Sequence, residues 1–451
     1  MDFREFVDKY KDEALELLQK LVSINSVLDY STVGPNQPFG KGIREALEFM
    51  ESKAKEDGFD TLNDEGYALR VKLNGASKDS IAVLGHLDVV PVDDNWETNP
   101  FIPTIIDGKL YGRGSMDDKG PVVASYIALK ILKNEGFRLS KNIELILGTD
   151  EETGWRGISH YKEKYQIPET GFSPDAEWPI INGEKGRIVL EFNGLPADDF
   201  TIHGGKVYNA VIGVAIATTK KDLTNEFSEY LKENGLEGNS KRTSDGYEYH
   251  LIGKTAHAMS PENGINAGMH LARFLNSYFV HPTLNFLTNC CFNDFNLAKL
   301  GLRCTHPVMG IITRNVGIMN IDKDKSFFTF DIRYPEGFRF QNFEAALKNI
   351  LGVYSLTYEL KENIEPHFID PNSDLVQKLY ISYIKYTNDL ENKPKTIGGG
   401  TYAKVLKNGV AFGMEDPTKP SVAHISNEFI RIDKFLEAIA IYADAIFELG
   451  K

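Results

Sequence analysis

Two short apolar runs, each followed at once by potential ligand side chains, constrain the fold of this chain most strongly. Residues 81–84 lead into His86, and residues 143–147 lead into an acidic triplet at 150–152. Between them, Gly120-Pro121 opens a stretch whose apolar residues follow a helical spacing, and proline suits a first helical turn. Strands that alternate with a helix predict an α/β fold with a mainly parallel sheet flanked by helices. Because ligands bind beyond the carboxyl ends of such strands, we expect both clusters at one edge of the sheet.

The middle of the chain has a different pattern. Segments 188–192, 247–252 and 327–332 alternate apolar and polar residues, which predicts an α+β region with antiparallel strands. Helical spacing returns after Pro371, and a length of 451 residues favours two domains. We therefore expect a catalytic domain formed by residues 1–186 and 369–451, interrupted by a large lid or substrate-binding domain at 187–368.

Charge and cysteine content limit the partners and the compartment. The formal net charge of −14 disfavours nucleic acid and anionic membranes as main partners. The first 24 residues interleave apolar and charged residues, unlike a signal peptide, and the chain contains no apolar run of about 20 residues. The chain has only three cysteines, without CxxC spacing, and such an odd and small number suggests a reducing compartment. We expect a cytoplasmic protein.

The first candidate ligand cluster is His86-Leu87-Asp88. In extended backbone His86 and Asp88 point the same way. Metal-bound histidines usually have a hydrogen-bond partner on the other ring nitrogen, and Asp88 could be that partner or could brace a ligand through the backbone. Taken alone, the pair is as compatible with a structural contact as with a metal site.

Four further groups of acids and histidines have an equally open interpretation on their own. Asp117 and Asp118 precede the predicted helix, where they could bind a metal or only cap the helix. The sequence GxxxxGK[ST] of a phosphate loop is absent. Glu151 and Glu152 could supply a metal ligand and a general base, or belong to a solvated acidic loop. Asp175 and His424 would add one oxygen and one nitrogen donor.

Eight motifs together resemble a known family. GHLDVVP, YGRGSMDDKGP, GTDEETGW, SPDAEWP, GKTAHAMSPENG, DIRYPEG, IGGGTYA and AHISNE occur in the order found in co-catalytic zinc peptidases of the aminoacylase, carnosinase and carboxypeptidase G type. The resemblance spans nearly the whole chain and is closest to the bacterial branch of PepV-type and Xaa-His dipeptidases.

The resemblance implies a site for two divalent metal ions. It places His86, Asp117 and Asp175 at one ion and Glu152 and His424 at the second, with Asp117 as the bridge. It makes Glu151 the general base that deprotonates a water activated by both metals, and it gives Asp88 a supporting role. Two cations, three carboxylates and a hydroxide come close to neutrality. Oxygen and imidazole donors without thiolates suit zinc first, and manganese or cobalt also.

The same resemblance implies a set of substrate-binding residues. His257 would stabilise the oxyanion, and Arg333 would bind a substrate carboxylate together with the loop Gly399, Gly400 and Thr401. Asn209 falls where the family can have a substrate-binding asparagine, but residues 210–212 are Ala-Val-Ile in place of the usual methionine and proline. Residues 412–423 also lack the Pro-Gly approach to the final histidine, so fine specificity stays open.

These observations predict a metal-dependent dipeptidase. An N-acyl amino acid deacylase or a carboxypeptidase with the same two-metal site is the alternative. A binding protein without catalysis would require the loss of a ligand or of the base, and all of them are present. We expect a monomer, with dimerisation through the lid as the other possibility.

Overall fold

The computed structural model describes residues 1–451, which form two compact units. The main unit comprises Met1–Gly183, Ile369–Lys395 and Gly400–Lys451, and the insert unit comprises Glu184–Phe368 with Thr396–Gly399. The sequence placed the first boundary after residue 186, a few residues later. The sequence analysis also assigned residues 396–399 to the catalytic domain, whereas in the structure this segment belongs to the insert unit.

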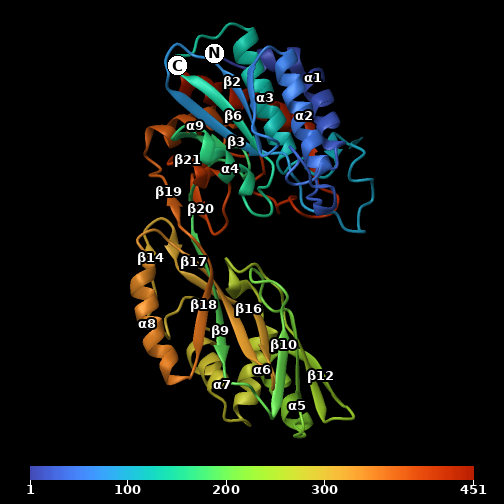
Figure 1. Ribbon diagram of the computed structural model, residues 1–451, viewed down its shortest axis with the longest axis vertical. Helices are drawn as coiled ribbons and strands as arrows, with labels where there is room; N and C mark the ends of the chain where they lie inside the picture. Colours follow the sequence, from blue (N-terminus) through green and yellow to red (C-terminus); the bar gives the residue numbers. More distant parts are fainter. The chain divides into compact units, whose positions relative to one another are not determined.

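The main unit is built on a mixed sheet in the order β1-β2-β6-β3-β7-β21-β8 (Figure 1). The four central strands β6, β3, β7 and β21 are parallel, whereas β1, β2 and β8 pair antiparallel. The strand bounds are β1 Asp60–Asn63, β2 Ala68–Leu73, β3 Ser80–His86, β6 Asn142–Gly148, β7 Thr170–Ser173, β8 Ile181–Glu184 and β21 Asn408–Ala411. A small sheet contains β4 Thr104–Ile106, β5 Lys109–Tyr111 and β22 Phe429–Arg431.

Helices cover both faces of the main sheet because its central strands are apolar on both sides. On β3, Ile81 and Val83 pack into a core with α1, α3 and α10, while Ala82 and Leu84 pack on the opposite face against α4. The helices are α1 Arg4–Val22, α2 Lys41–Glu56, α3 Lys119–Asn134, α4 Arg156–Lys164, α9 Asp374–Thr387 and α10 Ile432–Gly450. The expected α/β architecture is confirmed.

The insert unit is an antiparallel sheet in the order β12-β13-β11-β10-β16-β17-β9-β18. Alternate residues of β9 (Ile188, Leu190 and Phe192) enter one core together with residues of α5, α6, α7 and α8, which confirms the α+β prediction. Its main strands are β9 Gly186–Gly194, β10 Phe200–Gly204, β11 Val214–Thr219, β12 Glu237–Arg242, β13 Tyr247–Ile252, β16 Thr313–Ile321, β17 Ser326–Tyr334 and β18 Thr357–Ile364. The helices are α5 Thr224–Asn234, α6 Ala267–Asn276, α7 Pro282–Phe286 and α8 Phe340–Val353.

Short elements complete the chain. They are the 3-10 helices Tyr30–Thr32, Pro261–Asn263 and Tyr402–Val405, the π-helix Leu287–Cys291, and strands β14 Thr305–His306, β15 Gly310–Ile311, β19 His367–Phe368 and β20 Lys395–Ile397. None of the helices combines the length and the apolar character that a membrane crossing requires.

Candidate active site

His86 ends β3 with its ring directed at acidic side chains. Its Nδ1 lies 2.9 Å from the backbone oxygen of Asp88, and because a carbonyl only accepts, Nδ1 carries the proton. The other ring nitrogen, Nε2, lies 3.1 Å from Asp117 Oδ1 and 3.8 Å from Asp175 Oδ2. Because Nδ1 is used on the carbonyl, Nε2 is the nitrogen that a metal could bind.

The carboxylate of Asp88 braces the turn that follows β6 rather than the histidine ring. Its two oxygens accept the backbone N–H groups of Glu151 and Glu152, each at 3.1 Å, whereas Oδ1 lies 3.5 Å from His86 Nδ1. Since β3 and β6 are parallel, with His86 opposite Gly148, the segment after β6 comes within reach of Asp88. Of the two roles that the sequence left open for this carboxylate, the geometry favours the backbone brace.

Asp117 connects the two histidines of the cluster. Its Oδ1 faces His86, and its Oδ2 lies 2.8 Å from His424 Nε2. Glu152 Oε1 is 3.0 Å from the same His424 nitrogen. One carboxylate whose two oxygens face different imidazoles has the geometry of a bridging ligand. Two overlapping groups, each with ligand atoms within 4.8 Å of one another, contain His86, Glu151 and Asp175, and His86, Asp117 and Glu152.

Asp118 takes no part in this convergence. Its Oδ2 accepts the backbone N–H of His86 at 3.0 Å, and it makes no side-chain cap on α3. The alternative that these aspartates only cap the helix is therefore wrong for Asp118, which instead fixes the backbone of His86.

The charges of the cluster are unbalanced in favour of acid. Burial, followed by the charge of Asp117, raises the pKa of Asp175 to about 8. Burial also raises the pKa of Glu151 well above its usual value. Hydrogen bonds with Asp117 and Glu152 raise the pKa of His424 to about 11. A site in which acids hold protons and histidines hold charge is one that divalent cations would neutralise, so this donor set fits metal ions.

The side chains of the cluster differ in their exposure to solvent. The side chain of His86 is 1% exposed and that of Glu152 is 7% exposed, but that of His424 is 55% exposed. Of these three side chains, only that of His424 is exposed.

Glu428 is a supporting residue to which the sequence gave no role. It is completely buried, and its Oε2 accepts from Arg113 Nη1 at 2.7 Å and from Gly114 N at 3.0 Å. Its Oε1 accepts from the backbone N–H groups of Met116 at 2.8 Å and Asp117 at 3.1 Å. Glu428 thus holds the loop that presents Asp117. The motif AHISNE contains it, but only the pairing of β22 with β5 shows what it contacts.

Glu415 is a second supporting residue, and it holds the segment that precedes His424. Its Oε1 accepts from Ser421 Oγ at 2.7 Å and from the backbone N–H groups of residues 422 and 423. Its own backbone N–H donates to Ala176 O at 3.1 Å, and its carbonyl accepts from Trp178 N at 3.0 Å. The segment before His424 and the segment after Asp175 are thereby tied together.

Four of the expected substrate residues, Asn209, His257, Arg333 and Gly399, lie in the insert unit. Asn209 and His257 are held side by side, because Asn209 O accepts Ala258 N at 2.9 Å beside an Ala210–His257 bridge. His257 Nδ1 accepts Met259 N at 3.1 Å, so the ring proton is on Nε2, which can donate to a substrate. Arg333 on β17 is buried and donates to Asp331 through Nε at 2.6 Å and Nη2 at 3.2 Å.

The expected glycine loop spans the boundary between the units. Gly399 belongs to the insert unit, whereas Gly400 and Thr401 belong to the main unit. Gly398 O accepts from Arg333 Nη1 at 2.7 Å, and Thr401 Oγ1 accepts from Ala403 N at 3.1 Å, which caps the short helix that follows.

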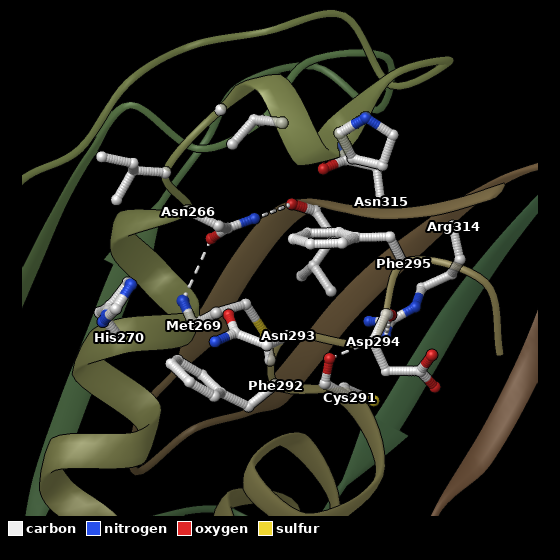
Figure 2. Close-up of a pocket in the computed structure, with 15 residues that line it drawn as sticks. Asn266, Met269, His270, Cys291, Phe292, Asn293, Asp294, Phe295, Arg314 and Asn315 are labelled. Carbon is white, nitrogen blue, oxygen red and sulfur yellow. Dashed lines mark hydrogen bonds between the residues drawn. The ribbon is translucent and has the colours of Figure 1, made fainter. Parts of the chain in front are cut away.

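A separate cavity of about 140 Å³ lies inside the insert unit, between α6 and the segment 291–295 (Figure 2). The polar side chains that line this cavity form hydrogen bonds with other lining residues. Asn266 accepts from Met269 N at 3.1 Å and donates to Val316 O at 2.8 Å, and Arg314 Nη2 donates to Cys291 O at 2.8 Å. None of the expected substrate residues lines it. We therefore exclude it from the candidate site.

Comparisons with known proteins show which family the chain resembles. A family model described as Peptidase family M20/M25/M40 matches residues 82–448. A protein of Staphylococcus aureus (strain USA300) described as "Putative dipeptidase" is 35% identical over 470 residues, with 99% of each chain covered.

Solved structures share the fold at lower identity. Human carnosine dipeptidase 1 is 17% identical with a TM-score of 0.58, covering 99% of this chain and 98% of that one. The di-peptidase Dug1p from Saccharomyces cerevisiae is 16% identical with a TM-score of 0.60 and the same coverage. Aminoacylhistidine dipeptidase from Vibrio alginolyticus is 17% identical with a TM-score of 0.59, covering 97% and 96%.

Proposed function

Since this chain belongs to peptidase family M20/M25/M40 and is therefore a peptide hydrolase, we propose that it is a dipeptidase that uses two divalent metal ions. The observation that carries the proposal is the position of Asp117, whose two oxygens face His86 and His424 separately. Asp175 lies on the His86 side and Glu152 on the His424 side, so each cation would have one histidine, one acid of its own and a shared aspartate.

Zinc is the metal we favour, with manganese and cobalt as substitutes, because all five donors are imidazole nitrogens or carboxylate oxygens. When bound, two such ions polarise the scissile carbonyl and lower the pKa of a water molecule. Asp88 keeps Glu151 and Glu152 in place from behind through their backbone N–H groups.

The protein's own groups then move the proton. Glu151 accepts one proton from the attacking water and returns it to the amine nitrogen as the C–N bond breaks, giving a carboxylic acid and an amine. The proton of the new acid then passes to the amine, so that the products leave as a carboxylate and an ammonium ion. His257 would donate its Nε2 proton in a hydrogen bond to the developing oxyanion. Arg333 and the loop of Gly399, Gly400 and Thr401 would bind the substrate carboxylate, and Asn209 would contact the peptide.

The full-length relatives favour a dipeptidase over a deacylase or a carboxypeptidase on the same site. We further propose a monomer, with a dimer through the insert unit as the alternative. We place the protein in the cytoplasm, in keeping with its three free cysteines.

A substrate panel tests the proposal. Dipeptides, tripeptides and N-acyl amino acids would be assayed on the zinc-loaded protein and on protein treated with a chelator. We expect dipeptides to be hydrolysed with the highest kcat/KM, and only with metal. A preference for N-acyl amino acids would move the function to the deacylase class, and hydrolysis by metal-free protein would overturn the metal site.

A further inference from the structure

The indole of Trp155 makes a direct hydrogen bond to the glutamate assigned as the base. Trp155 Nε1 lies 3.0 Å from Glu151 Oε1. The motif GTDEETGW contains both residues, but neither the metal site nor the substrate residues account for the tryptophan.

The main-chain turn that carries Trp155 is fixed independently of Glu151. Trp155 N donates to Asp150 O at 2.7 Å, and Trp155 adopts the left-handed conformation (φ 57°) at the start of α4. The carboxylate of Asp150 is buried and accepts from Arg156 through the backbone N–H at 2.9 Å, Nε at 2.8 Å and Nη2 at 2.7 Å. The indole is therefore held on a rigid turn.

The ring also has a fixed neighbour. Tyr402 packs edge-on against Trp155, with ring centroids 5.4 Å apart, and its ring also faces that of His86, with centroids 6.3 Å apart. An aromatic wall thus continues from the indole to the first metal ligand. It restricts the rotation of the indole and leaves its N–H directed at Glu151.

An indole N–H can only donate, and it keeps its proton at every accessible pH. It therefore occupies Oε1 of Glu151 whether or not the carboxyl group is protonated. We propose that Trp155 is a positioning residue that reserves Oε1 of Glu151, so that the proton of the attacking water is carried on Oε2 alone. This inference rests on the proposed function of Glu151.

The proton balance is simple. Water transfers one proton to Oε2 as its oxygen bonds to the carbonyl carbon, and Oε2 transfers that proton to the amine nitrogen as the C–N bond breaks. The hydrogen bond from Trp155 to Oε1 persists through both steps. Without it, Glu151 could rotate and present either oxygen, so that fewer encounters would have productive geometry.

Trp155→Phe tests the proposal, because it keeps an aromatic ring and removes the donor. We expect kcat to fall by about 10- to 100-fold, the scale of one hydrogen bond to a charged group, with KM and zinc stoichiometry unchanged. Trp96→Phe is the matched control, because its indole nitrogen is also buried but has no hydrogen-bond partner. It should change kcat by less than about twofold. An unchanged kcat in Trp155→Phe, or loss of zinc from it, would overturn the proposal.

A double-substitution cycle separates positioning from general support. If Trp155 acts through Glu151, adding Trp155→Phe to Glu151→Gln should change the residual kcat by less than about twofold. If kcat of the double variant fell by the product of the two single effects, Trp155 would act independently of Glu151, and the assignment would be overturned.

The hydrogen bond itself can be observed without turnover. The chain has three tryptophans, so zinc-loaded protein with ¹⁵N-labelled indoles should give three resolved N–H signals, assigned by Trp155→Phe. Glu151→Ala should shift the Trp155 signal and leave those of Trp96 and Trp178 in place. Three unmoved signals would overturn the hydrogen bond. Failure of the wild-type protein to hydrolyse any dipeptide would instead count against the proposed function.

Discussion

The acid cluster of the main unit and the arginine of the insert unit balance their charges in opposite ways. Around His86 and His424, buried carboxylates outnumber the imidazoles, and burial raises the pKa of Asp175 to about 8. Arg333, in contrast, already donates to both oxygens of Asp331 and to the carbonyl of Gly398. The acid cluster needs positive charge that the protein does not supply. The charge of Arg333, in contrast, is neutralised by Asp331 before any substrate arrives.

This difference sets the size of the effects that we expect. Removing the proposed metal ions from the cluster should abolish activity, because several ligands would lose the cations that they share. Removing Arg333 deletes only one contact with the substrate from a network that the protein has largely completed by itself. The four predictions below follow that order.

Metal removal should have the largest effect. Treatment with a chelator should abolish dipeptide hydrolysis, and zinc, manganese or cobalt should restore it. His86→Ala should lose bound metal together with activity, whereas Arg333→Ala should keep both ions by elemental analysis. Full turnover in a preparation shown to be free of metal would contradict the role of the cluster.

The two neighbouring glutamates should fail differently. Glu151→Gln removes a proton acceptor and leaves the ligands whole, so two metals should bind while kcat falls by about 10²- to 10⁴-fold. Glu152→Gln replaces an anionic ligand facing His424 with a neutral amide, which should weaken one metal site. Added metal should rescue Glu152→Gln in part and Glu151→Gln not at all. The test measures metal stoichiometry and turnover for both variants. Loss of a metal from Glu151→Gln but not from Glu152→Gln would exchange the two assignments.

Glu428→Gln should weaken metal binding without touching a ligand. One amide oxygen cannot accept all four donors that the Glu428 carboxylate accepts, so the loop before Asp117 should loosen. Supporting residues of this kind change metal affinity by about 10- to 100-fold. We expect a loss of that size in a zinc titration, with activity recovered at high zinc. Glu16→Gln, on an exposed helix surface, is the control. An unchanged affinity in a folded Glu428→Gln protein would rule out this role.

The sequence predicted those parts of the site that follow from strand ends. His86 and Glu152 converge because β3 and β6 are parallel neighbours, and two apolar runs were enough to indicate this. The sequence did not predict the short antiparallel strands β1 and β8, because four-residue strands carry too few residues for a periodic pattern.

Contacts between distant segments could not be predicted from spacing. Glu428 lies against the Asp117 loop because β22 pairs with β5, more than 300 positions earlier in the chain. The hydrogen bonds between Arg333 and Asp331 join residues that are close in sequence, since residues two apart on a strand share a face. That neighbouring acid was visible in DIRYPEG as a possible partner, but its bidentate geometry required coordinates.

The smallest effect should come from Arg333, and its geometry explains why an effect is expected at all. A guanidinium has five N–H donors, and three of those of Arg333 are used on Asp331 and Gly398. One N–H remains on each terminal nitrogen, which is the pair that a carboxylate can bind in a bidentate manner. A dipeptide amide lacks that carboxylate, so the wild-type enzyme should prefer the free acid by about 10- to 100-fold in kcat/KM. Arg333→Ala should lose most of this preference while keeping its metals. Arg187→Ala, which removes another arginine bound to Asp331, should keep it. Equal turnover of acid and amide by the unmodified enzyme would show that Arg333 binds no substrate carboxylate and that its bond to Asp331 is purely structural.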